Sequence, residues 1–470
     1  MTRRGWWLLA LSVVLPGSAQ LVAGNRVLAR IGLTAAAVFY AVVIGAVLLL
    51  TTQRGFVLSM VSNPTVLLVG QWLCYALALV WLVIQIDTFR LLQLVRIPSP
   101  TKAWIGGLMA IMLVLPTAGM AVAGNYAGSG RQVLDEVFDG TVIEEPIDGR
   151  YNILLLGGDA GSGRMGLRPD SISVVSVDAE TGQVAIIGIP RNLEMVPFSK
   201  GSPLYTPFPN GYDCGDNCLI HYLYPYAEEH PELYPDAAER GSTPGAEAMR
   251  DAVEGVLGIT VQYAVVIDMA GFGDLIDALG GIEVEVKERI DKGGWIKDGK
   301  VVGIKGWFEP GVQRLNGKDA LYYVRSRATT SDFSRMQRQR QVQEALLRQF
   351  DPVTVLTRFQ AIAEAGTRTV ITDIPSSMLA YFAELAMKSR DLELLRLELT
   401  PPTYSVVDRD YTKRHADVAE LLAPREPAPI NPPESEPGTE PGTGPGTEPA
   451  TDPGAKPAPT GPVIGGPKQG

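Results

Sequence analysis

The sequence predicts an α/β protein in which a mixed central sheet is covered by helices and preceded by α-helical membrane-spanning segments. The first 125 residues are apolar and poor in acidic side chains. Beyond residue 150, short β-type runs alternate with helical patterns bounded by Gly and Pro, as expected when helices cover a sheet. We therefore divide the chain into a transmembrane region (1–125), a linker or stalk (126–150), a folded domain (151–423) and a tail (424–470).

Three segments of the transmembrane region hold at least 20 consecutive residues without a charge, which is enough to cross a bilayer. They are residues 31–50, 64–86 and 103–123. Residues 6–24 are also apolar but are interrupted by Pro and Gly, so they either span or re-enter. Basic residues favour the cytoplasmic side, and Arg90, Arg96 and Lys102 lie between the second and third segments. We therefore expect a multi-pass protein of the cell membrane whose folded domain is extracytoplasmic.

The folded domain begins with YNILLL (151–156), a continuous apolar run typical of a strand buried on both faces. The Gly-rich run GGDAGSGRMG follows, and it matches neither GxGxxG nor a Walker sequence. SISVVSVD and QVAIIGIP are then separated by AETG, which predicts a hairpin. Arg191 comes directly after the second hairpin strand, at a position where sites of α/β folds assemble.

Two carboxylates flank the Gly-rich run. Asp159 follows the first predicted strand, and Asp170 leads into the second, so both lie near one edge of the sheet. A carboxylate pair beside phosphate-binding arginines suits Mg²⁺, with Mn²⁺ as an alternative. For either residue alone, ordinary turn chemistry is the competing interpretation.

The richest cluster of positive charge lies in residues 319–341, DALYYVRSRATTSDFSRMQRQRQ. We predict that LYYVRSR is a strand with Tyr323, Arg325 and Arg327 on one face. Thr330 or Ser331 then caps a helix that has Asp332 in its first turn. Arg335, Arg338 and Gln339 fall on one side of that helix by their spacing.

These two elements would aim four guanidinium groups at one volume. The planar fork of arginine pairs bidentately with phosphate oxygens and stays protonated, so the volume suits a phosphate or pyrophosphate. The competing interpretation is a solvated helix face that pairs with Asp and Glu. An arginine pair on one strand face has little structural use, which favours the anion site.

The remaining domain sequence predicts further helices at 243–258, 270–281, 352–370 and 375–388, and strands at 262–269, 282–288 and 392–400. The formal net charge of −10 argues against a nucleic-acid partner. The tail, with its PGTEP repeats, has very few large apolar residues to pack and is expected to be disordered.

The few cysteines and histidines limit which disulfides, metal sites and catalytic mechanisms the folded domain can have. Cys214 and Cys218 fall in the expected extracytoplasmic domain, where a disulfide persists. A metal site that adds His221 and His230 is the rival, although the spacing matches no zinc pattern. The chain has only three histidines and no HExxH or GxSxG motif, so the sequence offers little support for nucleophilic catalysis that depends on histidine.

The motifs YNILLLGGD, RPDS, IGIPRN, DLIDALGGIEV, GKDALYYVRSR and DFSRMQRQRQ occur in an order that resembles the LytR-CpsA-Psr family of cell-envelope proteins, over residues 150–422. The resemblance implies a phosphotransferase. Such an enzyme moves a cell-wall glycopolymer from a polyprenyl-pyrophosphate carrier to peptidoglycan and leaves a phosphodiester link, with Mg²⁺ on the pyrophosphate.

By the same resemblance, Asp159 and Asp170 would hold the metal. The pyrophosphate ligands would be Arg191, Arg325, Arg327, Arg335 and Gln339, with Asp332 supporting the arginines. Asn192 stands where the family usually has Asp, so an acid-base or metal role at that position is in doubt. Asp159 and Asp332 are both candidates for the general base. Two other functions stay open: a lipid-linked pyrophosphate hydrolase and a non-catalytic glycan-binding scaffold of the envelope.

Overall fold

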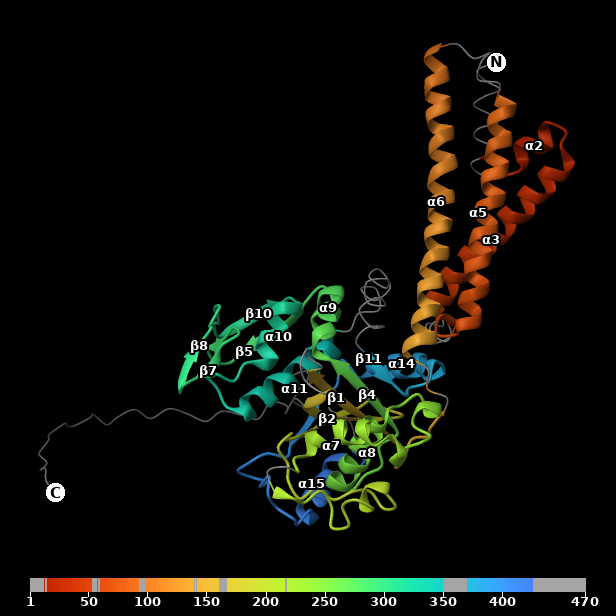
Figure 1. Ribbon diagram of the computed structural model, residues 1–470. Helices are drawn as coiled ribbons and strands as arrows, with labels where there is room; N and C mark the ends of the chain where they lie inside the picture. Colours follow the sequence, from red (N-terminus) through yellow and green to blue (C-terminus); the bar gives the residue numbers. More distant parts are fainter. Residues whose placement is uncertain are drawn as a thin grey trace, which may run out of the picture. The chain divides into compact units, whose positions relative to one another are not determined.

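The computed structural model describes residues 12, 15–52, 57, 60–92, 99–138, 140, 142–159, 167–215, 218–349 and 370–425 (Figure 1). The predicted helix at 352–370, except its last residue, and the tail beyond 425 lie outside them. So do the Gly-rich segment 160–166 and, within the apolar stretch 6–24, residues 6–11, 13 and 14. Of this last stretch, the structure describes the short helix α2 (Ser18–Val22).

Three helices are long and apolar enough to cross a membrane, as the sequence predicted. They are α3 (Arg26–Thr52), α5 (Pro64–Leu92) and α6 (Ser99–Val137). Helix α6 continues past residue 123, where we expected the third span to end. The first half of the predicted linker is therefore helical, which agrees with a stalk.

The folded domain is built on a six-stranded sheet with the order β11-β4-β1-β2-β3-β12. β1 runs antiparallel to β2 and parallel to β4, so the predicted mixed sheet is confirmed. The predicted hairpin is the β2–β3 pair. The strands are β1 (Arg150–Asp159), β2 (Arg168–Asp178), β3 (Val184–Ile189), β4 (Tyr263–Asp268), β11 (Val370–Thr372) and β12 (Leu395–Glu398).

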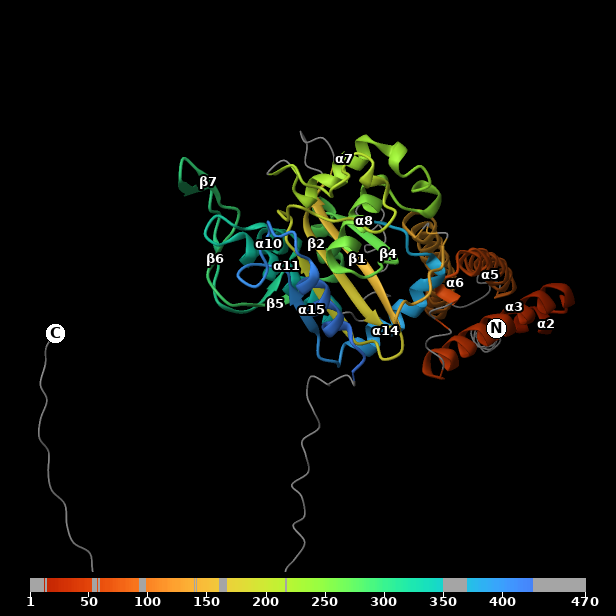
Figure 2. The ribbon, with the colours of Figure 1, turned by 90° about the horizontal axis from the view of Figure 1, so that it is seen from below.

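Alternate residues of β1 face two different apolar environments. Leu154 and Leu156 are buried in the main core against α7 (Leu223–Glu229), α8 (Pro244–Leu257) and α15 (Thr412–Leu422). Ile153 and Leu155 point to the opposite face, where they line an apolar cavity. Both sides of the strand are thus apolar, which explains the unbroken run YNILLL. Figure 2 views this layered arrangement from a second direction.

A second core lies beside the sheet. It joins α9 (Met269–Leu279), α10 (Gly317–Arg325) and α11 (Asp332–Gln349) to strands β5 (Ile282–Val286) and β10 (Gly311–Leu315). The small pairs β6 (Ile290–Asp291) with β9 (Trp307–Phe308), and β7 (Trp295–Lys297) with β8 (Lys300–Val302), extend this part. The 3-10 turn η7 (Ser376–Met378) and helix α14 (Leu379–Ser389) correspond to the helix predicted at 375–388.

The predicted strand LYYVRSR is wrong, because residues 317–325 form helix α10. Asn316 caps this helix: its Oδ1 accepts a hydrogen bond from the Asp319 amide at 2.8 Å. Ala320, Tyr323 and Val324 are buried together, at the three- and four-residue spacing of a helix. The aromatic and β-branched residues suggested a strand, but the cap and the shared buried face decide for a helix.

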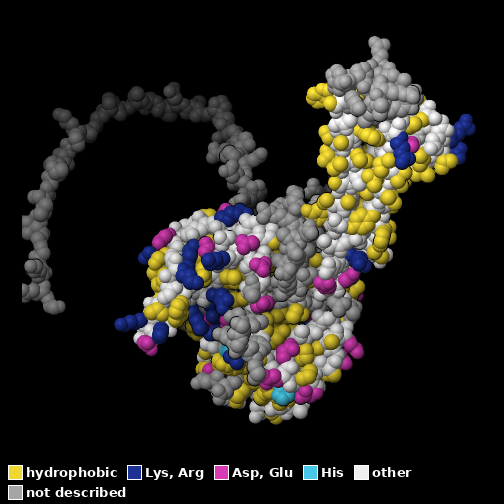
Figure 3. Space-filling model, turned by 45° about the horizontal axis from the view of Figure 1, so that its top comes forward, with side chains coloured by type: hydrophobic (Ala, Val, Ile, Leu, Met, Phe, Trp, Pro, Cys, Tyr) yellow, Lys and Arg dark blue, Asp and Glu magenta, His cyan; other side chains and the backbone are white. Residues whose placement is uncertain are grey.

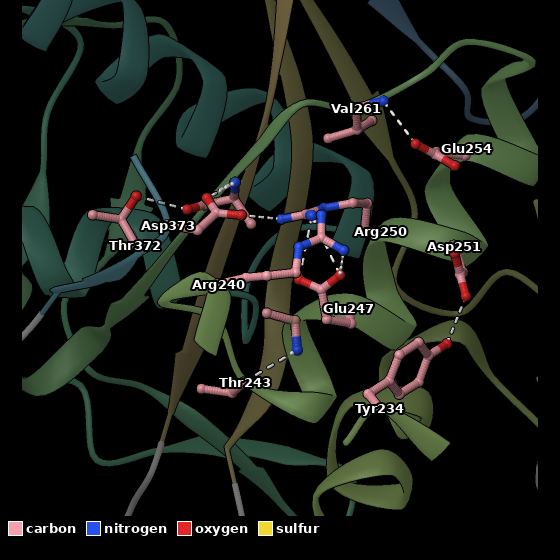
Figure 4. A network of polar contacts seen from close by, with 12 residues as sticks. Tyr234, Arg240, Thr243, Glu247, Arg250, Asp251, Glu254, Val261, Thr372 and Asp373 are labelled. Carbon is pink, nitrogen blue, oxygen red and sulfur yellow. Dashed lines mark hydrogen bonds and ion pairs between the residues drawn. The ribbon is translucent and has the colours of Figure 1, made fainter. Parts of the chain in front are cut away.

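Buried ion pairs tie α8 to the segment that follows β11. Arg250 lies between Glu247 and Asp373 (Figure 4). Its Nη1 is 3.2 Å from Glu247 Oε1, and its Nη2 donates to Asp373. Asp373 Oδ1 also accepts from the Ala264 amide of β4 at 2.7 Å. All three charged side chains are buried, so each depends on the others for compensation.

The structure places a disulfide between Cys214 and Cys218. Among the described residues, no group of three or more His, Cys, Asp or Glu side chains is arranged for a metal. The rival zinc interpretation of this segment therefore has no support in the described part of the chain.

Candidate active site

Residues from four elements line a polar cavity of about 150 Å³ at the edge of the sheet. They are Asp170 of β2, Met269 of α9, Val324 and Arg325 of α10, Arg327 just beyond it, and Arg335 and Gln339 of α11. Lys and Arg side chains gather on one face of the folded domain (Figure 3). Although α10 is a helix, its end and the extended residue Ser326 still direct Arg325 and Arg327 into this cavity.

Alternating charges link the sheet edge to α11. Arg191, just beyond β3, donates to Asp170 of β2. Arg191 Nε also lies 4.0 Å from Asp332 Oδ2, and Asp332 Oδ1 lies 3.0 Å from Arg335 Nη2. Asp332 therefore stands between two arginines, as the resemblance implied. Ser331 caps α11 at this point, because its Oγ accepts from the Ser334 amide at 3.0 Å.

Arg335 is a buried cation whose hydrogen bonds are incomplete. Among the described residues, its Nε and Nη2 have no hydrogen-bond partner, so the contact with Asp332 is a close charge pair rather than an aligned hydrogen bond. Burial lowers the pKa of Arg335, which measures the cost of placing this charge here. Buried donors without acceptors are costly unless a ligand completes them. The two donors suit the oxygens of an anion.

Gln339, one helical turn after Arg335, also lines the cavity. Its Nε2 donates to the Val324 carbonyl at 3.3 Å, while its buried Oε1 finds no hydrogen-bond partner among the described residues. Gln339 thus ties α11 to α10 at the floor of the site.

Arg338 does not join the cavity, although the sequence placed it with Arg335. Its Nε donates to the Tyr323 carbonyl at 2.8 Å, and its Nη2 donates to the Ser326 carbonyl. These carbonyls belong to the last turn of α10, where the carbonyl oxygens have no N–H donor within the helix. A three-residue step turns the side chain away from the Arg335–Gln339 face, toward these acceptors.

The register of the sheet places both predicted metal carboxylates at one edge. Asp159, the last residue of β1, is opposite Arg168 of β2, and Asp170 follows two residues later. The side chain of Asp159 is outside the described part of the structure. A site with two carboxylates fits Mg²⁺, which usually takes one or two and completes its shell with phosphates and water.

Arg168 is a site residue that the sequence reasoning missed. Arg168 lies two residues before Asp170 on β2, and the pairing of β1 with β2 is irregular between them. The Arg168 guanidinium lies over the Tyr222 ring, with Cζ 5.1 Å from the ring centroid, and its buried Nε has no hydrogen-bond partner in the part of the chain that the structure describes. The spacing RxD was the available signal.

Asn192, beside Arg191, has a buried Oδ1 without a hydrogen-bond partner in the described structure.

An apolar cavity of about 400 Å³ adjoins the polar one. Met269, Val324 and Gln339 line both. The apolar cavity lies between the sheet face of β1, β2, β3 and β4 and the helices α9, α11 and α14. Its walls include Ile153, Leu155, Val175, Ile186, Val265, Ile267, Phe272, Val342, Leu346 and Ala386. The site as a whole is amphiphilic.

The sequence profile of the LytR_cpsA_psr family matches residues 125–420. The chain belongs to this family. The resemblance seen in the motifs of residues 150–422 is thereby confirmed. The family region begins within α6 and includes the whole sheet and every residue of the polar cavity.

Two curated relatives illustrate the similarity. The polyisoprenyl-teichoic acid–peptidoglycan teichoic acid transferase TagU of Halalkalibacterium halodurans is 28% identical over 284 residues, which are 57% of this chain and 80% of that protein. The cell wall biosynthesis protein LcpA of Corynebacterium glutamicum is 27% identical over 342 residues, which are 66% of this chain and 61% of that protein.

Solved structures are also similar. The crystal structure of Bacillus subtilis TagV covers 60% of this chain and 98% of its own, with 22% identity and a TM-score of 0.40. A structure of TagT bound to LI-WTA covers 61% of this chain and 94% of its own, with 21% identity and a TM-score of 0.39.

Proposed function

We propose that this family member is an extracytoplasmic phosphotransferase that attaches a cell-wall glycopolymer to peptidoglycan through a phosphodiester link. The donor is the glycopolymer on a polyprenyl-pyrophosphate carrier. Support comes from relatives whose names describe teichoic acid transfer to peptidoglycan and cell wall biosynthesis. The three apolar helices support attachment to the cell membrane, in which the carrier lipid is held.

The observation that carries the proposal is the meeting of the two cavities at Met269, Val324 and Gln339. A polyprenyl pyrophosphate has an apolar chain and a doubly charged head in direct succession. The apolar cavity suits the proximal isoprene units, and the arginine-lined cavity suits the pyrophosphate. A soluble phosphate ester would need only the polar half.

In the proposed reaction, a sugar hydroxyl of peptidoglycan attacks the phosphorus that bears the glycopolymer. A new P–O bond forms, the bond from this phosphorus to the bridging oxygen breaks, and polyprenyl phosphate leaves. Arg325, Arg327 and Arg335 hold the phosphoryl oxygens and offset the charge on the leaving phosphate. The hydroxyl proton goes to a carboxylate, either Asp159 or Asp332.

Asp159 and Asp170 would hold Mg²⁺, or Mn²⁺ in its place, and Arg191 orients Asp170. When bound, the metal supplies charge stabilisation on the pyrophosphate oxygens. Arg191 now occupies one oxygen of Asp170, so a second oxygen of this carboxylate is left to the metal.

The decisive test uses the full chain in nanodiscs with a polyprenyl-pyrophosphate oligosaccharide, peptidoglycan fragments and Mg²⁺, with products read by mass spectrometry. A phosphodiester-linked adduct is expected. Release of phosphorylated oligosaccharide without an adduct would identify a hydrolase. Binding of the donor without turnover would identify the scaffold.

Filling the apolar cavity should discriminate between donors by lipid length. Leu155→Trp is expected to raise KM at least about tenfold for a long-chain donor, the loss expected when two methylene groups are excluded from burial. A donor whose pyrophosphate bears a methyl group in place of the polyprenyl chain should be nearly unaffected, because it has no isoprene unit to place in this cavity. Val312→Trp, an exposed position on β10, is the matched control. Equal effects on both donors would contradict the proposed lipid site.

Metal removal should stop transfer if the carboxylates act as proposed. EDTA is expected to abolish adduct formation, and added Mg²⁺ or Mn²⁺ to restore it. Asp170→Asn should lower kcat by about 100-fold or more, since a metal contributes several kcal/mol of transition-state stabilisation. Asp178→Asn, at the other end of β2, is the control and should retain activity. Full activity of the chain in EDTA would refute the metal role.

A further inference from the structure

Residues 219–222 run alongside the turn that carries Arg191. The Ile220 amide donates to the Leu193 carbonyl at 2.9 Å, and His221 Nδ1 lies 2.7 Å from the Arg191 carbonyl oxygen. Tyr222, the next residue, lies against Arg168. Two consecutive side chains of one segment therefore contact two arginines of the candidate site.

His221 holds the backbone of Arg191. A carbonyl oxygen accepts only, so Nδ1 must carry the proton and donate. The histidine is 7% exposed, and burial lowers its pKa, so the neutral imidazole is the form present near pH 7. The hydrogen bond fixes the carbonyl from which the Arg191 side chain reaches Asp170. A shift at this carbonyl would carry the guanidinium with it.

Tyr222 holds the other arginine by its ring. Its contact with the Arg168 guanidinium is within the range of a cation–π interaction. The described residues offer the buried Arg168 Nε no hydrogen-bond partner, and the contact with the Tyr222 ring helps to fix where this cation lies beside Asp170 on β2. The ring of His221 packs on Tyr222 at 4.1 Å between centroids, which links the two contacts.

The segment is anchored on its N-terminal side. The Cys214–Cys218 disulfide closes the chain immediately before Leu219, and Asp213 forms an ion pair with Arg409. Cys218 is buried in the main core. The disulfide, the ion pair and the burial of Cys218 thus hold the chain in position directly before His221 and Tyr222.

We propose that His221 and Tyr222 are positioning residues that hold Arg191 and Arg168 in place for a pyrophosphate group. The inference deepens the proposed function and rests on it for the identity of the ligand. Neither residue contacts the reacting atoms in this arrangement. Their effect reaches the substrate through the arginines.

The test for His221 measures binding of inorganic pyrophosphate with Mg²⁺ to the purified full chain by calorimetry, and transfer kinetics beside it. His221→Leu removes the Nδ1 donor and leaves the Arg191 carbonyl only the longer hydrogen bond from the backbone amide of residue 221 at 3.4 Å. This variant should weaken pyrophosphate binding about tenfold. His221→Asn places an amide donor near Nδ1 and should restore binding to within about threefold of the unmodified chain. The pH profile of the Asn variant should match that of the unmodified chain.

Tyr222 is tested by a parallel pair. Tyr222→Phe keeps the aromatic face and should bind pyrophosphate normally. Tyr222→Leu removes it and should weaken binding between about 2- and 30-fold, the range of a cation–π contact. Thermal unfolding of all four variants is measured to separate positioning from folding.

Three results would overturn the proposal. The first is a Leu variant that lowers the unfolding temperature but binds pyrophosphate normally, which would mark a purely structural residue. The second is an Asn variant as impaired as the Leu variant at unchanged stability. The third is an unmodified chain that does not bind pyrophosphate. If the unmodified chain binds pyrophosphate but transfers nothing, the proposed function fails and the positioning role stands.

Discussion

Arg335→Met is expected to reduce glycopolymer transfer by about 10²–10³-fold, the loss typical when one preorganised charge-stabilising donor is removed. The same change should leave the free energy of unfolding unchanged or raise it. Arg335 is buried with two donors that lack hydrogen-bond partners in the described structure, so the free protein carries an unfavourable free-energy term that a bound anion removes. Transfer kinetics and chemical denaturation of the full chain measure the two effects.

Arg338→Met is the matched control, three residues along the same helix. Arg338 donates to the carbonyls of Tyr323 and Ser326 instead of facing the cavity. Its loss should cost about 3 kcal/mol of stability, because two buried acceptors are left unpaired. The folded fraction should bind pyrophosphate nearly as well as the unmodified chain. A loss of binding as large as that of Arg335→Met would show that Arg338 is a direct ligand after all.

Arg250→Met should give the largest loss of stability, about 3–5 kcal/mol, because it leaves Glu247 and Asp373 as buried charges without their shared cation. The network ties α8 to the segment after β11, away from the residues that line the polar cavity. Transfer by the protein that remains folded should therefore be unchanged. Urea denaturation at neutral pH gives the stability difference.

Arg240→Met controls for the loss of any charge from this network. Arg240 lies 3.5 Å from Glu247, but its side chain is 43% exposed, so the pair is screened by solvent. Its removal should cost no more than about 1 kcal/mol. If the two variants were equally unstable, burial would not be what makes Arg250 important.

Several features of this protein follow from sequence alone. The three apolar segments, the β2–β3 hairpin and helix α8 with its Thr243 cap and Gly258 terminus are encoded by short-range patterns. The grouping of Arg335 with Gln339 is likewise local, since a four-residue step in a helix returns to the same face. The order of the motifs was sufficient to indicate the family.

Packing between distant segments decided the conformation of residues 317–325 and the direction of the Arg338 side chain. LYYVRSR satisfies a strand pattern locally, but the Asn316 cap and the buried face shared by Ala320, Tyr323 and Val324 make residues 317–325 helical. The Arg338 side chain points away from the polar cavity because it donates hydrogen bonds to carbonyl acceptors at the end of α10. Local periodicity shows which side chains share a face, but not which carbonyl, charge or cavity meets that face.

The same reason explains what was missed around the site. Tyr222 is 54 residues from Arg168 along the chain, and His221 is 30 from Arg191. No spacing rule connects such pairs, because the folded sheet brings them together. The apolar cavity is also a tertiary property: the run YNILLL predicts two apolar faces, whereas the packing of α9, α11 and α14 forms the cavity on one of them.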